Sequence, residues 1–342
     1  MFIPLLLGLL VLGSCSARSK SGAVSEEPKR AEATQGEPGL PLKRLDLRDA
    51  DRIDGLKLIE TGGAPTLLYS TEERSPAGGH ELVIRAVSLG SLAEVTEVAR
   101  IPRLLPPPPR WDARAVGPGQ YEFVFEEAGG ALYTVRIRNA RGDTHPVSSA
   151  HPFESFFRPH FVRGVTGPVP SEIGAVAENK TVVVFPAGAT GREKYTALVP
   201  GGDGVVGTGP GGERWVVAKT LGSGPAAFDV LPGQLALSRF SAVGGPRQVP
   251  FPDLIVFELD AERLGADVLV FATAKPAVLL SSARPARPFH LVADDRAWLL
   301  RLTWPTISVG RRQVRLAALC KPGDGRTMVL YGELPLTSVG GP

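Results

Sequence analysis

Short apolar runs, many of them alternating with polar residues, recur along most of this chain and are separated by segments rich in glycine and proline. Residues 66–70 and 81–87 form one pair of such runs, with a polar segment between them that contains two glycines and a proline. Short runs rich in β-branched and aromatic side chains and bounded by turn residues are typical of strands joined as hairpins. This first pair therefore predicts two antiparallel β-strands.

The same arrangement returns through the rest of the chain. Residues 120–126 alternate so that Tyr121, Phe123 and Phe125 share one face of a strand, and residues 132–137 lead back after a glycine-rich turn. Further runs of this kind predict strands at 55–60, 181–185, 194–199, 214–218, 227–231, 234–238, 253–259, 267–272, 278–281, 289–292, 297–302, 314–319 and 327–331.

Strands in such number favour an all-β fold. The pairs recur at roughly 30 to 60 residues, and a repeated four-stranded blade has a period in this range, so we predict a β-propeller of about five or six irregular blades. Residues 110–143 resemble a TolB-type propeller blade through Trp111, the turn from Gly117 to Gly119 and the Tyr-Glu-Phe and Leu-Tyr strands that follow. Two β-sandwich domains that meet near Pro159 are the alternative.

The chain opens with an apolar run over residues 2–12, followed by Gly13, Ser14 and Cys15. The run is roughly half the length of a membrane-spanning helix, and it fits the core of a secretory signal. Leu12-Gly13-Ser14-Cys15 resembles the lipobox of bacterial lipoproteins. That resemblance implies cleavage before Cys15 and lipidation of its sulfur. The alternative is that residues 2–12 form a buried first element and that Cys15 is an ordinary thiol.

Residues 16–41 are poor in apolar side chains and rich in small and charged ones, which is typical of a flexible tether. The expected organisation is a signal peptide at 1–14, the lipidated Cys15 and tether at 15–41, and an all-β domain at 42–342. Ser16 resembles the residue that follows the cysteine in lipoproteins sent to the outer membrane. The protein is therefore expected in the bacterial cell envelope, held to the outer membrane on its periplasmic or surface face.

Composition adds few constraints. The chain has 342 residues and a net charge of +3 with both signs interspersed, so nucleic acid is not an expected partner. The 40 glycines and 32 prolines are spread throughout, and helices are expected only at 91–100 and 260–264. Of the two cysteines, Cys320 ends an apolar run and is predicted to be a small buried residue without a disulfide partner.

One segment gathers histidines and aromatic residues. His145, His151 and His160 lie within sixteen residues of each other, but their spacing matches no common zinc motif, so neither a metal nor a cofactor is predicted. A possible binding surface is formed by His151, Phe153, Phe156, Phe157 and His160. The alternative is that the phenylalanines fill a gap between blades or domains and that the histidines cap turns.

The sequence carries no Gly-x-Ser-x-Gly nucleophile motif, and paired catalytic carboxylates cannot be assigned because their separation depends on the fold. The favoured function is a non-enzymatic binding or scaffold role in the cell envelope, with the membrane and an envelope protein or glycan as partners. The alternatives are an envelope hydrolase that acts on glycan or peptide, and a purely structural spacer.

Overall fold

Strands make up almost all of the regular structure. The computed structural model describes residues 39–339 apart from gaps at 62–63, 77, 104–109, 118, 127–130, 139–140, 147–154, 165–171, 189–193, 222–232, 241–245 and 324–325. Besides strands, this part of the chain contains two 3-10 turns, η1 (Ala50–Arg52) and η2 (Arg296–Leu300), and the four-residue helix α1 (Leu336–Val339). None of the helices within these ranges has the length and apolar character that crossing a membrane requires.

Within the described ranges the strands form six four-stranded antiparallel blades. Blade 1 holds β2 (Ile53–Thr61), β3 (Ala64–Arg74), β4 (His80–Ser88) and β5 (Ser91–Arg103), and blade 2 holds β6 (Trp111–Gly117), β7 (Gln120–Glu126), β8 (Leu132–Arg138) and β9 (Arg141–Pro146). Blade 3 holds β10 (Phe156–Phe161), β11 (Ile173–Ala177), β12 (Thr181–Phe185) and β13 (Thr196–Pro200), and blade 4 holds β14 (Asp203–Thr208), β15 (Arg214–Leu221), β16 (Gly233–Phe240) and β17 (Arg247–Pro250). Blade 5 holds β18 (Glu258–Leu264), β19 (Asp267–Thr273), β20 (Val278–Ser281) and β21 (Phe289–Ala293), and blade 6 holds β22 (Leu302–Val309), β23 (Gln313–Cys320), β24 (Met328–Pro335) and β1 (Leu40–Leu45).

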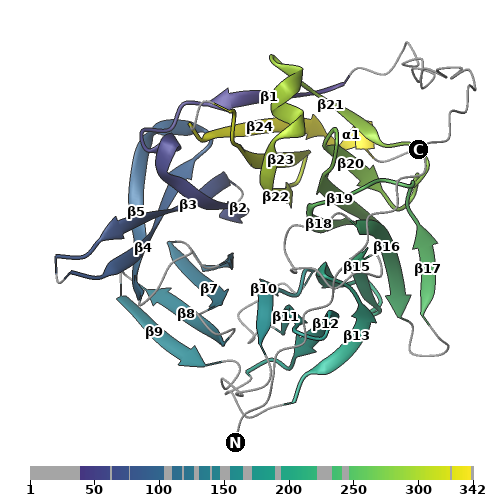
Figure 1. Cartoon of the computed structure of the whole chain (residues 1–342), viewed down its shortest axis with the longest axis horizontal. Helices are drawn as coiled ribbons and strands as arrows, with labels where there is room; N and C mark the ends of the chain where they lie inside the picture. Colours follow the sequence, from purple (N-terminus) through teal and green to yellow (C-terminus); the bar gives the residue numbers. More distant parts are fainter. Residues whose placement is uncertain are drawn as a thin grey trace, which may run out of the picture. The chain divides into compact units, whose positions relative to one another are not determined.

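The first strand of each blade lies nearest the common axis, where β2, β10, β18 and β22 are seen in Figure 1. These inner strands contact one another in the order β2, β6, β10, β14, β18 and β22, and β22 contacts β2 again. The sheets thus form a closed ring of six blades. The prediction of an all-β propeller is confirmed, and the blades do not separate into two sandwiches.

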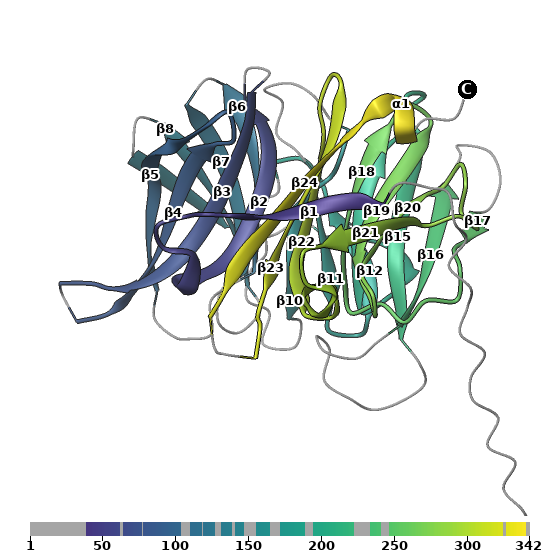
Figure 2. The same ribbon diagram turned by 90° about the horizontal axis from the view of Figure 1, so that it is seen from above.

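The ring closes through β1, the first strand of the described chain. Leu40 pairs with Leu291 of β21 in parallel register, and Lys43 pairs with Tyr331 of β24 in antiparallel register. β1 thereby joins blades 5 and 6 into one eight-stranded sheet, and Figure 2 shows it crossing beside β24 and β21. The first residues of β1 come from the segment that the sequence analysis assigned to the tether.

Hydrophobic packing occurs between blades. Among the described residues, six buried clusters each join two neighbouring blades around the ring. A blade is therefore covered on both faces, which explains strands such as β12, where four of the five residues are buried apolar side chains. Cys320 belongs to one of these clusters, as predicted, and its side chain is fully buried.

Three local predictions differ from the structure. The helices expected at 91–100 and 260–264 are parts of strands β5 and β18. Both segments pair along their length with a neighbouring strand, β4 and β19 respectively, and this pairing outweighs the local helical preference of their Ala, Glu and Leu residues. The strand expected at 297–302 is largely η2, and the one at 227–231 lies outside the described residues.

Candidate functional site

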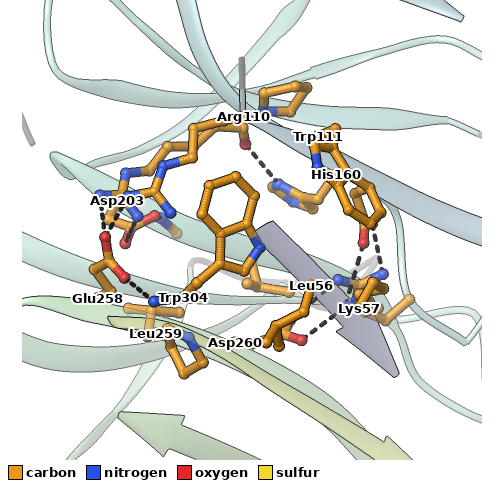
Figure 3. A pocket seen from close by; sticks show the side chains of 17 residues that line it. Leu56, Lys57, Arg110, Trp111, His160, Asp203, Glu258, Leu259, Asp260 and Trp304 are labelled. Carbon is orange, nitrogen blue, oxygen red and sulfur yellow. Dashed lines mark hydrogen bonds and ion pairs between the residues drawn. The ribbon is translucent and has the colours of Figure 1, made fainter. Parts of the chain in front are cut away.

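A pocket of about 510 Å³, open to solvent, lies on the axis of the ring. The six inner strands line it with equivalent short stretches, as Figure 3 shows for the labelled side chains. The lining residues are Leu56, Lys57, Arg110, Trp111, Asp112, Arg158, Pro159, His160, Arg163, Asp203, Gly204, Val205, Glu258, Leu259, Asp260, Trp304 and Pro305. The fold therefore brings side chains from all six blades to one place.

Arg158 and Trp304 occupy the same position in their respective inner strands. Both have a backbone φ of +51°, both precede a proline, and both lie at a β-bulge, in β10 and β22. A left-handed conformation costs a residue with a side chain roughly 1 to 3 kcal/mol, and such strain concentrates at functional sites. The equivalent position of blade 1 is Gly55, where a Cβ would lie 2.6 Å from the Trp304 ring. The missing side chain thus leaves room for the indole.

Four charged side chains that line the pocket form a closed cycle that we call the inner ring. Lys57 Nζ lies 2.6 Å from Asp260 Oδ2 and 3.3 Å from Asp112 Oδ1. Arg163 completes the cycle with Nη1 at 2.7 Å from Asp112 Oδ2 and Nη2 at 3.0 Å from Asp260 Oδ1. All four side chains are more than nine-tenths buried, and they come from blades 1, 2, 3 and 5.

Main-chain amides complete the coordination of both inner-ring carboxylates. Phe161 N donates to Asp112 at 2.9 Å, and Ala261 N and Ile307 N donate to Asp260 at 3.0 and 3.2 Å. Burial alone would raise the pKa of each carboxyl group, but the adjacent Arg163 and Lys57 hold the pKa of Asp112 and of Asp260 below its usual range. Both carboxyl groups of the inner ring therefore favour the ionised form.

A second charged group, which we call the mouth group, contains Arg110, Arg158, Asp203 and Glu258, and Arg110 is its most exposed member. Arg158 bridges the two carboxyl groups, with Nη1 at 2.9 Å from Asp203 Oδ2 and Nη2 at 3.4 Å from Glu258 Oε1. Glu258 also accepts hydrogen bonds from the Arg110 guanidinium and from the main-chain N–H of Trp304. Gly204 N donates to the other oxygen of Asp203 at 2.9 Å.

The two mouth carboxyl groups have opposite protonation tendencies. Burial raises the pKa of Asp203, and this effect exceeds the opposing influence of Arg158 and Lys219. Burial also acts on Glu258, but Arg110 and Arg158 together outweigh it and lower the pKa of Glu258 to about 2. The Arg158 guanidinium thus joins one carboxyl group whose pKa is raised, Asp203, to one whose pKa is lowered, Glu258.

Aromatic side chains form one wall of the mouth. The Trp304 ring lies 6.3 Å from the Trp111 ring, centroid to centroid, and the Arg110 guanidinium carbon lies 4.1 Å from the centre of the Trp304 ring. This is the geometry of a cation–π contact. Arg110 therefore covers an indole face that would otherwise be turned to the pocket.

The candidate residues from the sequence have different outcomes. His160 lines the pocket, but Phe156 packs in the core against Phe185 and Tyr195, and Phe157 is half-buried. His151 and Phe153 lie outside the described residues, as does Cys15, so the proposed five-residue surface remains a prediction.

His160 has no ring nitrogen left for a metal ion. Its Nδ1 lies 3.2 Å from the carbonyl oxygen of Arg158, and its Nε2 accepts from Val206 N at 2.9 Å. Among the described residues, His, Cys, Asp and Glu side chains do not gather in threes or more as a metal ion would require.

Sequence reasoning missed the charged residues of the inner ring and of the mouth. The stretches that carry them begin at Gly55, Arg110, Arg158, Asp203, Glu258 and Trp304. These positions recur at intervals of about 45 to 55 residues. Aligning the blades on that interval would have found them.

Comparison with known proteins identifies the fold but no family. No family model and no curated protein matches the chain. An α-L-arabinanase of Penicillium chrysogenum, solved with arabinobiose, has a TM-score of 0.54 at 10% identity over 88% of this chain and 99% of that chain. A lectin of Aleuria aurantia, solved with α-methyl-L-fucoside, has a TM-score of 0.50 at 10% identity over 87% and 96%. An α-L-arabinofuranosidase domain of Coprinopsis cinerea has a TM-score of 0.45 at 10% identity over 86% and 96%.

These findings correct the functional expectation. The non-enzymatic binding or scaffold role that was favoured from the sequence is wrong, because the similar structures include the arabinanase and because paired carboxyl groups line the axial pocket. The physical reason is that Asp203 and Glu258 lie on separate blades, and only the closed ring brings them together.

Proposed function

We propose that this chain is a hydrolase that acts on glycans, with its active site in the axial pocket and with Asp203 and Glu258 as the reacting pair. The observation that carries the proposal is the pair itself: two buried carboxyl groups, bridged by Arg158, whose pKa values are shifted in opposite directions. Such a divergence is the usual means of assigning an acid and a base.

Glycoside hydrolysis uses one protonated and one ionised carboxyl group on either side of the scissile bond. Asp203 would give its proton to the glycosidic oxygen as the bond from that oxygen to the anomeric carbon breaks. Glu258 would accept a proton from the water whose oxygen bonds to the same carbon, or would first bond to that carbon itself. The likeness to an arabinanase and to a fucoside-binding lectin supports a sugar ligand for this fold.

The test is hydrolysis of polysaccharides by the full chain in detergent, read as new reducing ends, with arabinan as the first substrate. Asp203→Asn and Glu258→Gln should each lower the rate by about a hundredfold or more. Glu172→Gln, which changes a half-exposed carboxylate paired with Arg214 on another part of the molecule, should leave it unchanged.

The pH profile gives a second readout. The rate should fall as pH rises through the elevated pKa of Asp203, since the proton donor is lost, and should fall at low pH only as Glu258 is protonated near its pKa of about 2. Full activity in both pocket variants, or sugar binding without turnover, would refute the hydrolase.

We also propose that Cys15 carries the lipid anchor and that the enzyme works in the bacterial envelope, at the outer membrane. The lipobox resemblance at 12–15 and the polar segment after it support this location. Cells fed a fatty-acid probe should label the wild-type protein and not Cys15→Ala. Equal labelling of the two proteins, or no labelling of either, contradicts the anchor.

A further inference from the structure

Arg110 is the most accessible member of the charged group at the mouth. Its side chain is 24% exposed, whereas those of Arg158 and Glu258 are 9% exposed and that of Asp203 is 4% exposed. It is also the residue directly before β6, and it follows four consecutive prolines in the sequence. Of the four side chains, Arg110 is the one that an incoming ligand meets first.

Arg110 uses only part of its hydrogen-bonding capacity. Among the described residues, one terminal nitrogen, Nη2, donates to Glu258 Oε1, and the plane of the guanidinium rests on the Trp304 ring. Nε and Nη1 have no partner within those ranges. A guanidinium presents its donors as a flat fork whose geometry matches a carboxylate.

Glu258 keeps two partners if Arg110 turns away. Oε1 retains Arg158 at 3.4 Å, and Oε2 retains the main-chain N–H of Trp304. The main energetic penalty of the movement is therefore that the Arg110 guanidinium loses its carboxylate partner. Removing one partner of an ion pair that is largely shielded from water leaves the other charge poorly compensated. A neutral hydroxyl group does not restore that loss, whereas a ligand that brings its own carboxylate does.

From this geometry we infer that the pocket recognises a sugar that carries a carboxylate, of the uronic acid class, and that Arg110 is the specificity-determining residue. The ligand carboxylate takes the place of Glu258 on the Arg110 fork, which uncovers the Trp304 face for the sugar ring and leaves Glu258 to Arg158. The inference rests on the proposed function. It names the substrate class of the proposed hydrolysis and describes how ligand binding would release Glu258 from Arg110 before the reaction.

The test measures binding alone, on the full chain in detergent, by ligand-observed NMR titration at constant ionic strength. Sodium D-glucuronate and D-galacturonate are the probes, D-glucose and D-galactose supply the ring without the charge, and acetate supplies the charge without the ring. At least one uronate should bind about tenfold more tightly than its neutral counterpart and than acetate.

Arg110→Gln should weaken uronate binding about tenfold or more. Arg110→Lys keeps the charge but not the forked donors, so its affinity for the uronate should lie between those of the wild type and of Arg110→Gln. Arg214→Gln is the matched control. The Arg214 side chain is 27% exposed, its Nη2 lies 2.6 Å from the Glu172 carboxylate, and neither residue lines the pocket. If Arg110→Gln fails to fold, as judged by its melting temperature, the comparison rests on Arg110→Lys.

Three outcomes of the titration count against the inference. Equal binding of glucose and glucuronate removes the carboxylate from recognition, and equal binding of acetate reduces the site to a bare anion site. No uronate binding at about 50 mM also overturns it. Uronate binding without any hydrolysis would instead refute the proposed function and leave the inference standing. Hydrolysis of neutral glycans with no uronate binding would refute the inference and leave the proposed function standing.

Discussion

His160 is buried beside the pocket with both ring nitrogens engaged by the main chain. Burial is the main reason that its pKa is lowered, from 6.5 to about 4, and the nearby Arg163 acts in the same direction. The folded protein thus keeps a neutral imidazole at pH values where an unfolded chain would already protonate it.

Stability should therefore fall as pH falls from 6.5 to about 4, because over that interval only the unfolded state takes up this proton. The full effect is about 3 kcal/mol, from the size of the shift. Urea unfolding of His160→Gln, whose amide oxygen can still accept from Val206 N, should give a flatter dependence over this range. The exposed His290→Gln is the control, and an unchanged slope in His160→Gln would show that another group is responsible.

The residues that define the pocket illustrate what sequence reasoning could reach at this scale. His160 was selected from its neighbours in the chain, and it does line the pocket, although as a hydrogen-bonded side chain. Arg158 and Trp304 were not selected, since their left-handed backbone arises from bulges that depend on pairing with other strands. Asp203 and Glu258 become a pair only through a guanidinium from a third blade.

At the scale of the element, several strand predictions match the structure closely. Residues 120–126, 181–185 and 278–281 were predicted as strands and are β7, β12 and β20 with the same bounds. Two of the errors fall in segments where polar or helix-favouring residues occupy a strand, namely β5 and β18. In β18 the buried Glu258 and Asp260 line the axial pocket, and these polar residues obscure the strand pattern in the sequence.

At the scale of the whole molecule, the inner ring links four of the six blades by charge. Lys57, Asp112 and Asp260 lie in the inner strands β2, β6 and β18, Arg163 follows the inner strand β10, and each carboxylate contacts both cations. Buried ion pairs add little net stability over apolar packing, but removing one partner leaves a charge without compensation. The ring is therefore sensitive to single changes.

Lys57→Met should lower the free energy of unfolding by about 3 to 5 kcal/mol, since Asp112 and Asp260 would then share only Arg163. Asp260→Asn should also destabilise the protein, and the double variant should lose clearly less than the sum of the two. Chemical denaturation of the three variants measures this coupling. Strict additivity would mean that the cycle does not act as a unit.

The place of β1 has a consequence for how the chain is made. Its partners β21 and β24 lie about 250 to 290 residues further along, so β1 emerges from the ribosome long before either strand exists. Until then its exposed backbone edge is a site for unwanted pairing. The blades between can assemble one after another, but the circle cannot be completed until β21 and β24 have both been made, and a factor that shields the early strand until then would raise the yield of correctly closed protein.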